Sequence, residues 1–178
     1  MAKPKVAFYW CASCGGCEEA VVDLAEDILK VVDAVDIALW PVAIDTKLEQ
    51  VKAWEPGEVA VAFINGAVRL SEQEMWVKLL REKCPTVVAF GSCAHLGGIP
   101  GLANDFTAEE ILANKYFNSA TVDNPDKVLP QEHCTVDGYE VELPHFFKDV
   151  KSLDQVIDVD YYLPGCAPPP NLIMDAVT

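Results

Sequence analysis

Basic residues are scarce in this sequence: 13 Lys and Arg stand against 28 Asp and Glu, which gives a formal net charge of −15 at pH 7. Nucleic-acid recognition needs a basic face, and anionic membranes attract basic segments, so the charge argues against both partners. No apolar run approaches the roughly 20 residues of a membrane span. Residues 1–5 carry neither a signal peptide nor a twin-arginine signal, so we expect a cytoplasmic protein.

Internal repeats and low-complexity tracts are also absent, and 178 residues are enough for one domain with a real core. We therefore expect a single domain over residues 1–178. Hydrophobic residues make up 51% of the chain, which is high for a chain with this much charge. Two explanations stay open. Part of the apolar surface faces a partner, or a sheet covered on both faces needs many Val, Ile and Ala.

A disulfide framework is not indicated either. The cysteines are odd in number and no secretory signal precedes them, which favours metal or redox use of some of them. They are Cys11, Cys14, Cys17, Cys84, Cys93, Cys134 and Cys166. The first three lie within seven residues, and Gly15 and Gly16 between them let the backbone fold tightly around a bulky inorganic group.

Short apolar runs predict the strands of a parallel sheet, because strands buried on both faces are apolar throughout. These runs are residues 6–10, 35–40, 59–64, 86–90 and 159–163. Apolar residues at three- and four-residue spacings predict a helix over residues 18–30. Ser71 with Glu74 resembles a capping box that opens a second helix to about residue 83, and residues 171–177 begin a last one. The pattern is typical of an α/β protein.

Two stretches interrupt this alternation. Residues 94–101 are rich in glycine and are predicted to form a loop. Residues 102–158 are acidic, weakly helical around 107–117, and are predicted to leave the sheet as an excursion.

Four cysteines follow predicted strands, where the carboxyl ends of parallel strands meet at one edge. Cys14 and Cys17 follow the first strand, Cys93 the fourth and Cys166 the fifth. Four thiolates fit either tetrahedral zinc or an iron–sulfur cluster. The last two cysteines are single residues in Gly/Pro-rich loops rather than a close pair, which favours iron–sulfur, while a structural zinc scaffold remains the alternative.

A third interpretation is a flavin-binding electron carrier on the same kind of sheet. It would need a Ser/Thr-rich phosphate loop after the first strand, and this chain has thiols there instead.

Three motifs in order resemble the small subunit of [NiFe] hydrogenases, best the cytoplasmic F420-reducing and heterodisulfide-reductase-linked types. They are Cys14-Gly-Gly-Cys17-x-Glu19, Gly91-Ser-Cys93-Ala94-x-x-Gly97-Gly98-Ile99-Pro100-Gly101 and Pro164-Gly165-Cys166-x-Pro-Pro. Related subunits occur in energy-converting hydrogenases and complex I. The alternative interpretation is therefore the iron–sulfur subunit of a complex I-like or energy-converting oxidoreductase. Complex I homologues have two adjacent cysteines at the first motif, and this chain has separated ones.

The resemblance implies a flavodoxin-like, doubly wound parallel sheet with an iron–sulfur site at the C-terminal ends of its strands. It implies a proximal [4Fe–4S] cluster on Cys14, Cys17, Cys93 and Cys166. It also implies a large subunit with the nickel–iron centre and further iron–sulfur or flavin subunits as partners. Glu19 is implied as a possible proton relay, although Glu is also common in a helix's first turn.

The resemblance has two departures near the site. Cys11 is an additional thiol; spacing alone leaves its role open, but it belongs to the strand end and we expect it not to be a ligand. Asn65-Gly66 stands where many relatives have Glu-Gly, so no carboxylate role carries over there.

Three further residues have ordinary explanations as well. Cys84 is expected to be a packed residue and Cys134 a loop residue. His95, two residues after Cys93, is expected either to donate to a cluster sulfur or partner group, or to be a solvated loop residue.

Overall fold

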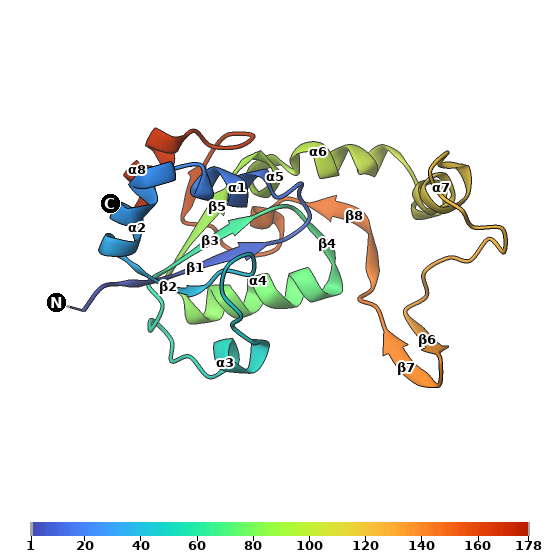
Figure 1. Ribbon diagram of the computed structural model, residues 1–178, viewed down its shortest axis with the longest axis horizontal. Helices are drawn as coiled ribbons and strands as arrows, with labels where there is room; N and C mark the ends of the chain where they lie inside the picture. The colour runs from blue at the N-terminus through green and yellow to red at the C-terminus, as the bar shows by residue number, and fades with distance from the viewer. Residues whose placement is uncertain (1, 178) are drawn as a thin grey trace.

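The structure is a computed structural model that describes residues 2–177 (Figure 1). Its centre is a five-stranded sheet in the order β2-β1-β3-β5-β9, with every neighbouring pair parallel. Its strands are β1 (Lys5–Trp10), β2 (Asp36–Leu39), β3 (Val61–Asn65), β5 (Thr86–Phe90) and β9 (Tyr161–Leu163). The expected α/β fold with a parallel sheet is confirmed. Counted along the chain, the order is 2-1-3-4-5, which doubly wound sheets of the flavodoxin type use.

Helices cover both faces of the sheet (Figure 1). They are α1 (Gly16–Val22), α2 (Ile28–Ala34), α3 (Leu48–Lys52), α4 (Ser71–Lys83), α5 (Ser92–Leu96), α6 (Gly98–Gly101), α7 (Ala108–Ala113) and α8 (Pro170–Val177). In Figure 1, α1, α2 and α8 lie above the sheet and α3 and α4 below it. In the part of the chain that the structure describes, no helix has the length and apolar character needed to cross a membrane.

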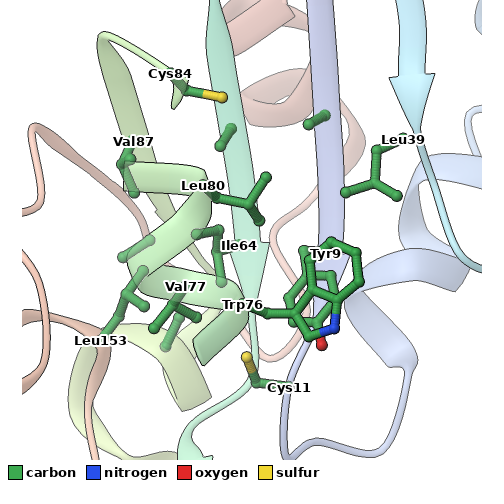
Figure 2. Close-up of a cluster of buried hydrophobic side chains, with 14 of the residues drawn as sticks. Tyr9, Cys11, Leu39, Ile64, Trp76, Val77, Leu80, Cys84, Val87 and Leu153 are labelled. Carbon is green, nitrogen blue, oxygen red and sulfur yellow. The ribbon is translucent and has the colours of Figure 1, made fainter. Parts of the chain in front are cut away.

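The core has two layers because successive side chains of β1 alternate between the faces. Tyr9 stacks on Trp76 of α4, with ring centroids 5.0 Å apart, in the layer drawn in Figure 2. Phe8 points the other way and stacks on Phe63 at 5.1 Å, beneath α1, α2 and α8. Both faces are buried, which explains why the strands are continuously apolar.

Two predictions about helices are wrong in detail. The helix expected over residues 18–30 is broken: α1 ends at Val22 and a 3-10 helix, Ala25–Asp27, precedes α2. The capping box at Ser71 is also wrong, because Ser71 is already helical. Its hydroxyl accepts from the backbone N–H of His145 at 2.9 Å instead. The Gln73 side chain accepts from the amide of Leu70 at 3.0 Å, so the helix starts one residue earlier than its sequence indicates.

The glycine-rich stretch 94–101 is not a loop but two short helices, α5 and α6. Gly97 joins them in the left-handed conformation, with φ +83°, which ends α5 and starts α6 without a Cβ penalty. The chain therefore turns sharply just beyond Cys93.

The excursion leaves the sheet and returns to it, as the yellow and orange segments of Figure 1 show. Its elements are the 3-10 helix Leu102–Asp105, α7, a π-helical turn Asn114–Asn118, the hairpin of β6 (His133–Val136) and β7 (Tyr139–Glu142), β8 (Phe146–Lys151) and the 3-10 helix Leu153–Gln155. The weak helix near residues 107–117 is confirmed. The excursion rejoins the body where β8 pairs with β4 (Val68–Leu70), and Asn104 exchanges two hydrogen bonds, of 2.9 and 2.7 Å, with the backbone of Val150.

An ion pair fixes the start of β9, and it generates a prediction about stability. Asp160 Oδ2 accepts from Arg81 Nη1 at 2.5 Å and from the backbone N–H of Val87 at 2.7 Å, and the Arg81 hydrogen bond is the main reason why the pKa of Asp160 is lowered. The substitution Asp160→Asn should lower the free energy of unfolding by about 1 kcal/mol at pH 7, a modest amount because the carboxylate is partly exposed. A carboxyl with a lowered folded-state pKa stabilises the protein above its unfolded pKa, so the difference should shrink below about pH 4. Urea unfolding of both proteins at pH 7 and pH 3.5 measures this, and a difference that is independent of pH would contradict it.

Candidate metal centre

The four cysteines that follow strands come together at the carboxyl edge of the sheet. Cys14 lies in the loop after β1, Cys93 in α5 after β5, and Cys166 in the loop after β9. These three line one cavity of about 420 Å³, whose other walls are Ala12, Ser13, Ile99 and Pro100. Residues separated by more than 150 positions in the sequence thus share one cavity.

Cys17, in the first turn of α1, is buried close to the other three thiols. Burial, together with the smaller effect of the nearby charges of Cys93, Cys14 and Cys166, raises the pKa of Cys17 to about 12. Burial also raises the pKa of Cys93, and again Cys166 and Cys14 add to the effect. The four thiols are therefore close enough to repel one another when they ionise, which a cationic centre would relieve.

Two glycines bring backbone against these thiols. A Cβ at Gly91 would lie 2.3 Å from Cys17 Sγ, and a Cβ at Gly98 would lie 2.9 Å from Cys93 Sγ. Both glycines have positive φ, +83° and +51°, so the side chain is excluded by space and by conformation. The thiols thus sit in a cradle that only glycine permits.

The donor set fits a polynuclear group. Among residues 2–177, no three His, Cys, Asp or Glu side chains are grouped so that they could hold one metal ion. Cys14, Cys93 and Cys166 instead line a cavity with Cys17 close by, and a sulfur-only donor set around a space of this kind suits an iron–sulfur cluster.

The other cysteines lie elsewhere. Cys11 is buried in the core layer below the sheet, near Trp76 in Figure 2, because it continues the alternation of β1. Cys84 belongs to the same layer, where burial raises its pKa to about 11. Cys134 is half-buried in β6 of the excursion rather than in a loop. His95 packs its ring against Tyr162, with centroids 4.7 Å apart.

The two glutamates of α1 have opposite surroundings. Glu19, the residue expected to relay protons, is exposed and borders a second cavity with Trp10 and Cys14. Its neighbour Glu18 is only 2% exposed, and its carboxylate accepts from Trp40 Nε1 and Asn65 Nδ2. Burial raises the pKa of Glu18, and the two hydrogen bonds partly offset this.

Sequence reasoning missed this buried carboxylate. Both glutamates occupy the first turn of the helix, and only the fold brings the two donors, from the ends of β2 and β3, to one of them.

The fold and the thiol cavity define an α/β protein with a candidate iron–sulfur centre at the carboxyl edge of a parallel sheet. The chain belongs to the family described as NADH ubiquinone oxidoreductase, 20 Kd subunit, whose model matches residues 14–178. It is 42% identical over 165 residues to an iron-sulfur subunit of the F420-non-reducing hydrogenase of Archaeoglobus profundus, covering 92% of this chain and 51% of that protein. It is 35% identical over 175 residues to a subunit of the F420-non-reducing hydrogenase of Methanothermobacter thermautotrophicus, covering 98% of this chain and 52% of that protein.

A solved structure shows the same similarity at the level of the fold. The fold superimposes on a chain of an NAD+-reducing [NiFe]-hydrogenase with a TM-score of 0.81 and 26% identity, covering 97% of this chain and 87% of that one. The resemblance to [NiFe]-hydrogenase small subunits is thereby confirmed. This chain spans about half the length of the two curated relatives.

The glycine cradle predicts a selective effect on iron binding. In Gly91→Ala the new methyl group would displace Cys17 Sγ, so we expect loss of most of the iron bound per chain. The matched control is Gly138→Ala, because Gly138 has nearly the same φ, +85°, and has no atom within 4 Å of the added Cβ. The control should lose about 1 kcal/mol of stability from the left-handed backbone and keep its iron. Iron analysis after anaerobic purification compares the two; equal iron content would show that the cradle does not position Cys17.

Proposed function

We propose that this chain is the electron-transfer small subunit of a cytoplasmic [NiFe] hydrogenase, and that Cys14, Cys17, Cys93 and Cys166 hold a proximal [4Fe–4S] cluster. Residues 1–178 act as one flavodoxin-like domain with the excursion at about 102–158. The observation that carries the proposal is the convergence of these four thiols, of which Cys14, Cys93 and Cys166 line one cavity and Cys17 lies close to them, in a chain of this family.

The roles of the chain's own residues follow from their positions. When bound, the cluster would supply a one-electron redox centre. Cys17 and Cys93 provide buried ligands, while Cys14 and Cys166 provide exposed ones on the outer side of the cavity. Ile99 and Pro100 form an apolar wall there, which limits water at the sulfur atoms and so tunes the potential.

The surface beside the cavity is suited to a large protein partner. Apolar side chains protrude from α5, α6 and the following 3-10 helix: Leu96 is 72% exposed, Ile99 70% and Leu102 61%. Contiguous exposed apolar residues mark interaction surfaces. We infer that the large subunit with the nickel–iron centre docks there, and that further iron–sulfur or flavin subunits accept the electrons. Glu19, exposed at the same edge beside Cys14, is proposed as a proton-relay carboxylate toward that subunit.

Serine substitution tests the ligand set. Replacement of Cys14, Cys17, Cys93 or Cys166 should remove or convert the cluster, because serine is a poor ligand for iron–sulfur centres. Cys11→Ser, Cys84→Ser and Cys134→Ser are the controls and should keep the iron and sulfide content and the EPR signal of the reduced protein. A colourless or yellow wild-type protein would point to zinc or flavin instead, and cluster loss in Cys11→Ser with retention in Cys14→Ser would reverse the assignment.

Assembly with the large subunit tests the docking surface. Hydrogen-dependent dye reduction should require both subunits, and binding should slow hydrogen exchange of residues 96–102. Ile99→Asp places a charge in the contact and should weaken binding by at least about tenfold, since interface centres exclude unpaired charge. Leu29→Asp is the control, because Leu29 is similarly exposed but lies on α2. Dye reduction by the chain alone, or equal binding of both variants, would count against the proposal.

A further inference from the structure

Asn65, the last residue of β3, is fully buried and contacts the segment, the loop after β1 and the first turn of α1, that carries Cys14 and Cys17. Its Oδ1 accepts from Ser13 Oγ at 2.9 Å, and its Nδ2 donates to the Glu18 carboxylate and to the backbone oxygen of Tyr9 at 3.3 Å. Ser13 immediately precedes Cys14 and Glu18 immediately follows Cys17. One side chain therefore holds both ends of the segment between the two thiols.

The network continues on each side of Asn65. The Ser13 hydroxyl accepts from the backbone N–H of Gly15 at 3.3 Å, which shapes the turn between the thiols. The second carboxylate oxygen of Glu18 accepts from Trp40 Nε1, just beyond β2. The loop is thus tied through buried polar groups to the ends of β2 and β3, the two strands that flank β1.

The chemistry of the partners dictates how Asn65 is oriented. A carboxylate can only accept, so the amide nitrogen must face Glu18, while the Ser13 hydroxyl can donate to the amide oxygen. Burial of a charged group is unfavourable unless donors satisfy it, so Glu18 requires both Asn65 and Trp40. An aspartate at position 65 has nearly the same shape but would set two acceptors against each other.

We propose that Asn65 is a positioning residue of the cluster site: by holding Ser13 and Glu18 it sets the spacing of Cys14 and Cys17, and hence the retention and midpoint potential of the cluster. The inference rests on the proposed function, because it takes these two thiols to be ligands. Groups that orient metal ligands typically change metal affinity 10- to 100-fold when they are removed.

The test compares Asn65→Asp with wild type in the full chain, purified anaerobically. The variant should release iron to a chelator at least about tenfold faster, and its midpoint potential, measured by EPR-monitored titration, should shift. Asn104→Asp is the matched control, since Asn104 also ties two segments together but bonds to the backbone of β8 and not to the segment that carries Cys14 and Cys17; its release rate and potential should equal those of wild type.

Rescue separates positioning from general destabilisation. Adding Glu18→Gln to Asn65→Asp puts an amide opposite the new carboxylate and restores a donor–acceptor pair, so release rate and potential should return toward wild type. If Asn65→Asp does not fold, Ser13→Ala, which removes only the hydroxyl contact, should still release iron severalfold faster.

Two outcomes overturn the inference: an Asn65→Asp protein with wild-type release rate and potential, or a Ser13→Ala protein with an unchanged release rate. Failure of the proposed function would give a different result from either of these, because the wild-type protein itself would then contain no cluster.

Discussion

The site depends on one constraint, the parallel direction of all five strands of the sheet. Parallel strands end at the same edge, so each loop that follows a strand opens onto a common surface. The register runs unbroken from β1 through β3 to β5, with Tyr9 beside Ile64 and Ile64 beside Ala89. The loops after β1, β5 and β9 are therefore held at one level, and their thiols meet at one edge of the sheet.

This constraint explains which features were predictable from the sequence. The strands were predictable because burial on both faces requires unbroken apolar runs, and residues 86–90 match the observed strand at both ends. The convergence of Cys93 and Cys166 with the first motif followed from strand ends alone. The expectation that Cys11 belongs to the end of the strand followed as well, and its side chain keeps the alternation of β1.

The features that were not predictable depend on contacts between distant residues. Asn65 with Gly66 has the composition of a turn, and nothing local distinguishes a turn asparagine from one that is buried under a thiol loop. Glu18 and Glu19 are equally suited to a helix start, and Trp40 and Asn65 select between them only in the folded chain. The paired helices α5 and α6 likewise depend on the sharp turn at Gly97, just beyond Cys93.

The ionisation of the thiols at the cavity determines how much of the free energy of metal binding the protein and a metal group would each have to supply. Burial and mutual repulsion raise the pKa of Cys17 and Cys93, so at neutral pH these thiols stay protonated without a cation nearby. Iron binds thiolates, so loading must release protons and must overcome that cost. In the proposed site the glycine cradle and the Asn65 network would reduce the rest of the cost, because they fix the sulfur positions and leave little conformational entropy to lose. In such a site the fold would fix the positions of the four sulfur atoms, and a bound metal group would neutralise the thiolates and so also stabilise the folded chain.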